Sequence, residues 1–516
     1  MQRFVSHRKL SDPKDEKSSR DPSVERRKQS WTYDGKSFAA AFILACCFLV
    51  FLNVYAYKQS IANELENPNV TAKVPTYALF GKNVDSGYLR HVIAVFERLG
   101  FQRVDVSSKW DVLWAHEYPF RNMYSVLKNL KPHQKVNHFP GSGYITNKLE
   151  LSTSELPHLP RAFRMPQDKE RLLEYAKADE DLMFVQKDNN HRGITIKHIN
   201  ELNLSANNTF IQEYVSKPFL IDGYKFDIGV YTILTSINPL RVYIYDGDIL
   251  FRFCPVKYYP FDPQILDKYV VGDDYLPIWK VPSLKKYYVD KGFSMKDTFN
   301  AFVESQGKDP STIWTQVNEA IRNIYLQKES KIRQSTLHYQ SSTNFFEMVR
   351  IDFVIDEDMN VFLMEANMSP NLSSAHYPPN QLLYEQVIFN TLALVGVAQR
   401  IKSSDLQIRS VAEEDMMVAL KNIVVFPHLC SSHLCQTCEN ALCDVCKHCL
   451  TIDVLNQLKN AYKEHVNRLD CRRVFPPAMT PPLPNITSYG NAYSPENQRV
   501  ARWFLGKCHI DHSWCS

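Results

Sequence analysis

Residues 345–372, with the sequence FFEMVRIDFVIDEDMNVFLMEANMSPNL, constrain the fold of this chain more than any other segment. Two apolar stretches flank the polar residues 356–360, a pattern that predicts a β-hairpin. If residues 358–359 form a two-residue loop, Asp352 lies directly opposite Glu365. The Cβ atoms of such a pair are about 5 Å apart on one face of the sheet. The segment therefore predicts a sheet with a polar site on it.

The polar residues of this hairpin have the chemistry of a magnesium site. Asn367 lies two residues after Glu365, so its side chain shares the face of the two carboxylates. Carboxylate and amide oxygens suit Mg²⁺ and leave room for phosphates and water. The structural alternative buries two carboxylates in hydrophobic strands without a cation, which is costly. We therefore predict that Asp352, Glu365 and Asn367 bind Mg²⁺.

A second candidate site follows an apolar strand predicted at residues 181–187 (DLMFVQK). Lys187 ends this strand, and Arg192 and Gly193 come after a polar turn. A lysine at this position can place its charge on a phosphate while Arg192 and the Gly193 amide close over it. The structural alternative is a surface lysine at the end of a strand.

Two further strands are predicted at residues 209–215 (TFIQEYV) and 225–234 (KFDIGVYTIL). In the second, Lys225 and Asp227 are two residues apart and so lie on one face. They are either a structural ion pair or polar groups that face a ligand cleft.

The overall fold class is α/β (α+β). Residues 74–115 alternate apolar strands with a helical apolar pattern that Gly100 ends. The composition, 44% hydrophobic and 22% charged, excludes a wholly disordered chain, a collagen and a bare coiled coil. The net charge of +4 does not predict nucleic-acid binding. The P-loop, dinucleotide-binding, zinc-protease and serine-hydrolase motifs are absent from the sequence, and no nucleophile stands out.

The N-terminal region differs from the centre of the chain. Residues 1–37 are rich in charge and serine, which predicts a disordered basic tail. Residues 38–57 (FAAAFILACCFLVFLNVYAY) are long enough to cross a bilayer core of about 30 Å as a helix. The alternatives are a buried core helix and a signal peptide, although a small-residue cleavage site is lacking. The basic excess before this segment predicts a single-pass signal-anchor protein with a cytosolic N-terminus and a lumenal or extracellular main domain; a cytosolic-facing domain is the alternative.

The C-terminal region, residues 426–516, predicts a small Cys-rich module. A small segment with little apolar core needs cross-links, so disulfides are the first expectation. Because the number of cysteines is odd, one thiol pairs elsewhere, with Cys254 for example, or stays free. Zinc is the alternative if the module is cytosolic, because the CxxC pairs have ligand spacing. Five glycosylation sequons agree with a lumenal glycoprotein. The nine cysteines are Cys430, Cys435, Cys438, Cys443, Cys446, Cys449, Cys471, Cys508 and Cys515.

Several segments between these ends together resemble the tubulin tyrosine ligase-like proteins. The resemblance covers about residues 74–402 and implies an ATP-grasp-type fold. It also implies an ATP- and Mg²⁺-dependent ligase of the polyglutamylase kind, which adds glutamate to acidic side chains or tails of a protein such as tubulin through an acyl phosphate. The matching segments are HFPG at 138–141, Leu159-Pro160, Lys187, RGI at 192–194, IQEYV at 211–215, LIDGYKFD at 220–227 and EANMSPNL at 365–372.

The resemblance also implies roles for individual residues. Lys187 would hold the phosphates, Lys225 and Asp227 would face nucleotide or acceptor, and the hairpin residues would bind Mg²⁺. An acidic acceptor needs nearby cations, for which Arg241 and Arg252 are candidates, with ordinary surface arginines as the alternative. The residues expected to line the adenine are Gln212, Glu213, Tyr214 and Val215. The candidate catalytic residues are Lys187, Arg192, Lys225 and Arg252.

The chain departs from the family pattern in two places. Gly229 stands where the family usually has an arginine after KFD[LI], and residues 266–290 lack the family's HLTN-type segment. These departures keep a lumenal nucleotide-binding pseudoenzyme as an alternative. A membrane-anchored interaction protein that acts through its Cys-rich module is another. The predicted lumenal domain also conflicts with tubulin as an acceptor, because tubulin is cytosolic.

Overall fold

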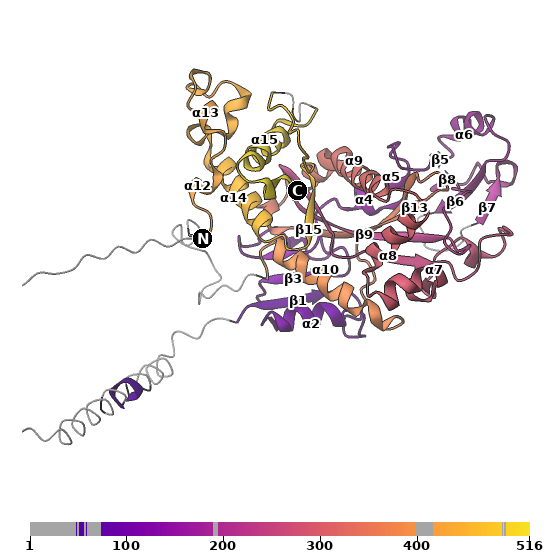
Figure 1. Cartoon of the computed structure of the whole chain (residues 1–516), viewed down its shortest axis with the longest axis horizontal. Coiled ribbons are helices and arrows are strands. Elements are labelled where there is room, and N and C mark those ends of the chain that lie inside the picture. The colour runs from indigo at the N-terminus through magenta and orange to yellow at the C-terminus, as the bar shows by residue number, and fades with distance from the viewer. Residues whose placement is uncertain are drawn as a thin grey trace, which may run out of the picture. The chain divides into compact units, whose positions relative to one another are not determined.

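A computed structural model describes residues 48, 51–55, 58, 74–188, 195–398, 416–487, 489 and 492–516 (Figure 1). The chain divides into two compact units, residues 1–71 and 72–516. In the first unit, the described residues are helical and exposed. Among the residues that the structure describes, no helix combines the length and the apolar character that a membrane span requires. The tail at 1–37 lies outside the described residues, as does most of the segment 38–57, and both assignments stay predictions.

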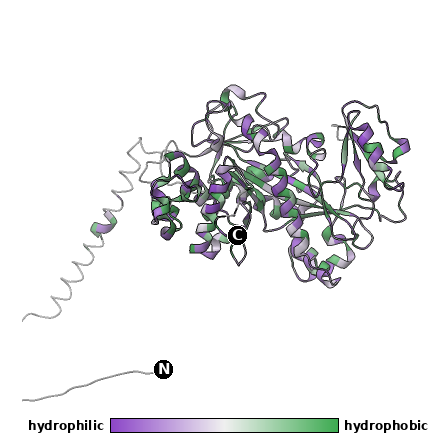
Figure 2. Cartoon of the chain, turned by 90° about the horizontal axis from the view of Figure 1, so that it is seen from above, coloured by the Kyte–Doolittle hydropathy of each residue, from purple (hydrophilic) through white to green (hydrophobic). Residues whose placement is uncertain are grey.

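The second unit is built around a seven-stranded antiparallel sheet (Figure 1). Its longest strand is β9 (Phe226–Ile237), of which every residue except Ser236 is buried. One edge of β9 pairs with β13 along most of its length, and the other pairs with β11 and then β10. Figure 2 shows hydrophobic residues along these inner strands. The remaining strands are β10 (Leu240–Tyr245), β11 (Leu250–Phe253), β12 (Leu276–Pro277), β13 (Glu347–Ile355), β14 (Val361–Asn367) and β15 (Cys471–Phe475).

A small parallel sheet begins this unit. The helical pattern expected after the first strand is α2 (Arg90–Arg98), whose inner face buries Val92, Val95 and Phe96. Gly100 ends this helix in a left-handed conformation with φ of +82°, as the sequence predicts. The strands are β1 (Thr76–Phe80), β2 (Gln102–Arg103), β3 (Val112–Ala115) and β4 (Lys135–Val136).

A second small sheet, antiparallel with the order β5-β8-β6-β7, carries the other predicted strands. Lys187 and Gln212 lie on its central strands β6 and β8. The predicted turn after Lys187, which includes Arg192 and Gly193, lies outside the described residues. The strands are β5 (Ala162–Met165), β6 (Met183–Asp188), β7 (Thr195–His198) and β8 (Thr209–Glu213).

Helices cover the central sheet. The long helix α9 contacts β9, β10, β14 and β15, and α10 packs against α2. The principal helices are α5 (Lys148–Ser152), α6 (Lys169–Ala176), α7 (Pro282–Lys285), α8 (Met295–Ser305), α9 (Ser311–Thr336), α10 (Gln381–Leu394), α14 (Ile452–Val466) and α15 (Pro495–Ile510), with short turns at α3 (Tyr124–Leu127), α4 (Gly143–Thr146), α12 (Leu420–Ile423) and α13 (Pro427–Cys430).

The C-terminal segment is part of the same unit as the ligase-like segment. Its strand β15 pairs with β10 and so extends the central sheet. Glu464 of α14 accepts two hydrogen bonds from the buried Arg241 of β10, at 2.7 and 2.9 Å. A second hydrophobic core in this segment includes Trp503 and Phe504 of α15.

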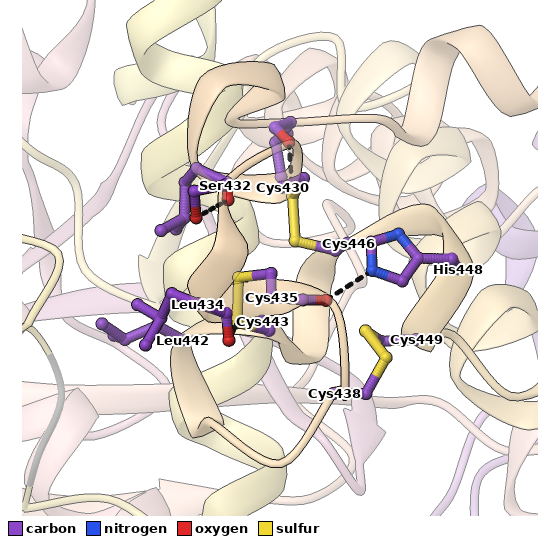
Figure 3. Close-up of a disulfide and its surroundings, with 12 residues drawn as sticks. Cys430, Ser432, Leu434, Cys435, Cys438, Leu442, Cys443, Cys446, His448 and Cys449 are labelled. Carbon is purple, nitrogen blue, oxygen red and sulfur yellow. Dashed lines mark hydrogen bonds between the residues drawn. A yellow bond between two sulfur atoms is a disulfide. The ribbon is translucent and has the colours of Figure 1, made fainter.

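Disulfides, the first expectation for the cysteines, hold the Cys-rich segment (Figure 3). His448 donates a hydrogen bond to the carbonyl of Cys435 beside them. Cys438 and Cys449 lie close enough to His448 to share a metal ion, but their sulfurs are bonded to each other. Cys254 and Cys471 are free and buried. The bonds are Cys430–Cys446, Cys435–Cys443, Cys438–Cys449 and Cys508–Cys515.

Candidate functional site

The β13-β14 hairpin brings Asp352 opposite Glu365, as the sequence predicts. Ile355 pairs with Val361, so the connection is residues 356–360, as the sequence predicts, and not the two-residue loop at 358–359 assumed for the register. A bulge after Asp352 shifts the register by one residue. The longer loop and the bulge cancel, so the predicted pair is right although the assumed two-residue loop is wrong.

A row of residues crosses four strands at this point. Leu250 of β11 pairs with Gly229 of β9, Gly229 with Asp352 of β13, and Asp352 with Glu365 of β14. The glycine has no side chain, so space opens in the row beside Asp352. Larger side chains from neighbouring positions enter this space.

Asp352 is surrounded by donors. Arg350 binds it through two nitrogens, with Nε to Oδ1 at 2.7 Å and Nη2 to Oδ2 at 2.8 Å. Arg252 donates to Oδ2 at 2.9 Å, and the Asn367 amide donates to it at 3.0 Å. Asp352 is therefore not a buried carboxylate without a cation, because the protein itself supplies two cations, Arg350 and Arg252.

Arg252 also binds Asp227, with Nε to Oδ1 at 2.9 Å and Nη2 to Oδ2 at 2.7 Å. The two residues pair across β11 and β9. Burial raises the pKa of Asp227 even though Arg252 favours the charged carboxylate. Arg252 therefore bridges two aspartates and is not an ordinary surface arginine.

Glu365 is the more accessible carboxylate, with a side chain 34% exposed. Its Oε2 lies 3.3 Å from the Lys148 amine, and its Oε1 accepts from the Asn367 amide at 3.1 Å. Burial alone would raise the pKa of Glu365, but Lys148, Asn367 and Arg350 together lower it to about 2. Glu365 is therefore a charged group at neutral pH.

Lys187 faces the same region from β6. Its amine donates to Gln212 Oε1 at 3.1 Å, while the Nε2 atom of the buried Gln212 has no hydrogen-bond partner among the residues that the structure describes. Burial and, to a lesser extent, the nearby Lys148 lower the pKa of Lys187 to about 8, while Glu365 opposes the shift. Two amines thus face one carboxylate, and an unsatisfied donor lies beside them. Such a set suits an anion.

Lys225 and Asp227 are engaged separately. The Lys225 amine donates to the carbonyl of Tyr269 at 3.1 Å and lies 4.9 Å from the centre of the Tyr214 ring. Burial lowers the pKa of Lys225 to about 8. Tyr269 belongs to the segment that departs from the family pattern, so that segment reaches the candidate site.

The other predicted residues take different places. Tyr214 is buried and shares a hydrogen bond with Tyr258, whereas Glu213 accepts from Tyr175 at 2.6 Å. Val215 is half-buried just after β8. Arg192 lies outside the described residues.

Arg241, the other arginine proposed for an acidic acceptor, does not join the site. It pairs with Ser236, nine residues along β9 from Asp227, which is about 30 Å at the usual rise of a strand.

Sequence reasoning missed two members of the site. Arg350 had a signal, because it precedes Asp352 by two residues and so shares its strand face. Lys148 had none: it lies on the short helix α5, which Asn147 caps, and only the fold brings it to Glu365.

Comparison with known proteins identifies the family. Residues 126–404 match the Tubulin-tyrosine ligase family, as the sequence resemblance predicted. A Caenorhabditis elegans protein named "Probable tubulin polyglutamylase ttll-15" is 42% identical over 447 residues, which cover 84% of this chain and 85% of the relative. Mouse tubulin polyglutamylase TTLL6 is 26% identical over 60% of this chain and 39% of its own length, and human tubulin monoglutamylase TTLL4 is 26% identical over 56% and 25%. This chain belongs to the tubulin-tyrosine ligase family.

Proposed function

We propose that this protein is an ATP- and Mg²⁺-dependent ligase that adds glutamate to acidic side chains or tails of a protein such as tubulin. The observation that carries this proposal is the placing of Lys148 and Lys187 near Glu365, beside a Gln212 amide that no described residue satisfies. Relatives named as tubulin polyglutamylases and monoglutamylases support the choice of glutamate and of tubulin.

In this proposal the nucleotide lies between β6-β8 and the central sheet. Lys187 holds the phosphates as a positive point charge. The segment from Gln212 to Val215 lines the base, with Lys225 and Asp227 beside the nucleotide. The free donor of Gln212 supports this assignment, because a buried amide without a partner is costly unless a ligand satisfies it.

Glu365 and Asn367 would hold Mg²⁺. Glu365 is charged and partly exposed, and Asn367 uses its nitrogen for Asp352 and Glu365, so its oxygen remains for a cation. Asp352 already accepts from two arginines, and we assign it to hold Asn367 in place. When bound, Mg²⁺ would neutralise charge on the phosphates.

The chemistry follows from these positions. The acceptor carboxylate attacks the γ-phosphorus of ATP, the bond to ADP breaks, and an acyl phosphate forms. The amino group of the incoming glutamate then attacks the acyl carbon and releases inorganic phosphate, leaving an amide. Lys187 and Lys148 stabilise charge during the first step, so the protein contributes mainly position and electrostatics.

The test is incorporation of labelled glutamate into purified tubulin by the full chain. Glu365→Gln should reduce incorporation by about a hundredfold or more, because a neutral amide is a weaker ligand than a carboxylate for the Mg²⁺ that would neutralise the phosphates. Glu319→Gln is a matched control, since Glu319 is a half-exposed carboxylate on α9 whose nearest ion-pair partner is His158 and not a residue of the site. Equal incorporation by wild type and Glu365→Gln would contradict the assignment of Glu365.

A second candidate function is nucleotide binding without ligation. Two observations favour it. Arg350 and Arg252 bind the carboxylate of Asp352, a predicted metal ligand, and Gly229 stands where the family usually has arginine. ATP binding without glutamate transfer to any acidic protein would support this candidate over the ligase. Failure to bind ATP at millimolar concentration with Mg²⁺ would contradict both.

We further propose that the protein is a single-pass membrane protein whose ligase domain faces a lumen. The four disulfides and the exposed sequons at Asn203, Asn207 and Asn485 support this orientation. The acceptor would then be an acidic protein of that compartment. Endoglycosidase treatment should shift the mobility of the wild type but not of a variant that lacks these asparagines and Asn69. An unshifted wild type with a protease-sensitive domain in intact microsomes would contradict the orientation and favour tubulin.

A further inference from the structure

Gly229 has no room for a side chain. A Cβ atom added to it would lie 2.9 Å from Cδ of Arg350 and 3.3 Å from Nε of the same residue. It would also lie 3.3 Å from Oδ1 of Asp352. The space above Gly229 is therefore filled by an arginine that comes from the neighbouring strand.

Arg350 is held firmly in this space. Arg350 is only 6% exposed, and its guanidinium binds both oxygens of Asp352. Arg252 reaches Asp352 from the opposite side of Gly229. The glycine therefore lies between two guanidinium groups that bind one carboxylate.

We propose that Arg350 is a positioning residue that supplies from β13 the guanidinium that the family pattern places on β9 at Gly229. It orients Asp352, and through Asn367 it orients Glu365. This inference rests on the proposed nucleotide site, and it accounts for a guanidinium on Asp352 beside position 229 although that position is a glycine.

The charges of the site support the proposal that Arg350 takes the place of an arginine at position 229. Two arginines balance Asp227 and Asp352, so both carboxylates are neutralised by the protein. The remaining amines, Lys148 and Lys187, then face Glu365 with an excess of positive charge for phosphates. Without Arg350, Asp352 would have only Arg252, which it already shares with Asp227, and the Asp352 charge would compete for the lysines.

The geometry requires a guanidinium and not simply a positive charge. Arg350 uses two nitrogens in a fixed fork, whereas a lysine amine is a point charge. Arg350→Lys should therefore keep the charge yet fail to hold Asp352 in its observed orientation. This expectation separates positioning from simple charge balance.

A reciprocal exchange tests the inference in the full chain. The variants are Arg350→Gly, Gly229→Arg, the double variant with both changes, and Arg350→Lys. ATP affinity with Mg²⁺ is measured by calorimetry, and the unfolding temperature is measured for each protein. Arg472→Gly is the matched control, because Arg472 is also an ion-paired arginine on a strand of the sheet, bound to Asp246.

Arg350→Gly and Arg350→Lys should weaken ATP binding by about tenfold or more, as expected for lost charge-assisted hydrogen bonds. Gly229→Arg should lower the unfolding temperature, because its side chain meets Arg350. The double variant should recover ATP affinity to within about threefold of the wild type, since one guanidinium again serves Asp352. Arg472→Gly should lower the unfolding temperature without changing ATP affinity.

Two results would overturn the exchange: wild-type affinity in Arg350→Gly, or a double variant as weak as Arg350→Gly. If the wild type itself binds no ATP, the proposed function fails and the unfolding temperatures decide the exchange separately. The double variant should then be more stable than the sum of the two single changes predicts. If the losses of stability in the two single variants simply add in the double variant, the proposal that Arg350 replaces an arginine at position 229 is contradicted.

Discussion

The amine of Lys187 donates to the side-chain oxygen of Gln212 at 3.1 Å, across the paired strands β6 and β8. This contact satisfies one of the three protons of the amine with a neutral group. The amine thus lies beside Lys148 without a carboxylate hydrogen-bonded to it in the described part of the chain. A charged group in this state is available for an anionic ligand, and it costs stability when no ligand is bound.

Lys187→Met should therefore separate binding from stability. We expect ATP affinity to fall by about 10- to 100-fold, because a charge-assisted contact with phosphate is lost. The free energy of unfolding should stay equal or rise, since a desolvated charge is removed. Calorimetry with ATP and denaturant unfolding measure the two effects. A large loss of stability with unchanged affinity would contradict the assignment.

The pH dependence of ATP binding should follow the same lysine. Because its pKa in the protein is about 8, the amine is increasingly neutral above that pH, and ATP affinity should fall as pH rises. The free energy of unfolding should rise with pH between about pH 8 and 10.5. In this range the unfolded chain still binds the proton that the native lysine has lost. Lys187→Met should reduce the pH dependence of both ATP affinity and the free energy of unfolding. Part of each pH dependence should remain, because Lys225 titrates in the same range.

Lys135 provides the control for this measurement. Burial also lowers its pKa to about 8, and its amine donates to the carbonyl of Thr343. Lys135→Met should reduce the slope of stability with pH but leave ATP affinity unchanged. Loss of the pH dependence of binding in Lys135→Met would show that Lys187 is not the group responsible.

The buried pair between Arg241 and Glu464 should stabilise the attachment of α14 to the sheet. Glu464→Gln leaves the Arg241 charge buried without a counter-charge and should lower the free energy of unfolding by about 3–5 kcal/mol. The double change Arg241→Leu and Glu464→Leu should cost less, because no buried charge remains. Guanidinium unfolding of the three proteins measures this difference. A loss below about 1 kcal/mol in Glu464→Gln would contradict the prediction.

Thiol labelling should distinguish disulfides from zinc ligands. In denaturant without reductant, Cys254 and Cys471 should be labelled, and the other eight cysteines after residue 73 should be protected. A chelator should not change this pattern, whereas it would expose zinc-bound thiols. Removing the Cys508–Cys515 bond with paired alanines should cost about 2.5 kcal/mol by the loop-closure estimate. Labelling of all ten cysteines after residue 73 once a chelator is added would favour zinc.

The strands that carry the site could be predicted because their signals are local. Side chains alternate along a strand, so the apolar stretches around Asp352 and Glu365 fix which residues share a face. The same rule identified Lys225 and Asp227. The helix that ends at Gly100 was equally predictable, because only the spacing of a few apolar residues and one glycine was needed.

The partners of these residues depended on the tertiary structure. Lys148 reaches Glu365 from a short helix more than two hundred residues earlier in the chain, and Glu464 reaches Arg241 from the C-terminal segment. No local period relates such positions. The sequence also could not show that Arg252 reaches Asp352, because Arg252 comes from β11, whereas Arg350 lies on the same strand as Asp352.

The sequence by itself determined the family, the paired carboxylates of the hairpin, and the lysines that end or begin apolar strands. Each of these features depends only on residues that are close together in the chain. The tertiary structure decided which charges meet: Arg350 fills the space over Gly229, and Arg252 bridges Asp227 and Asp352. It also decided that β15 joins the central sheet. The physical reason is that side-chain alternation is a property of one strand, whereas ion pairing and sheet extension depend on how distant strands are packed together.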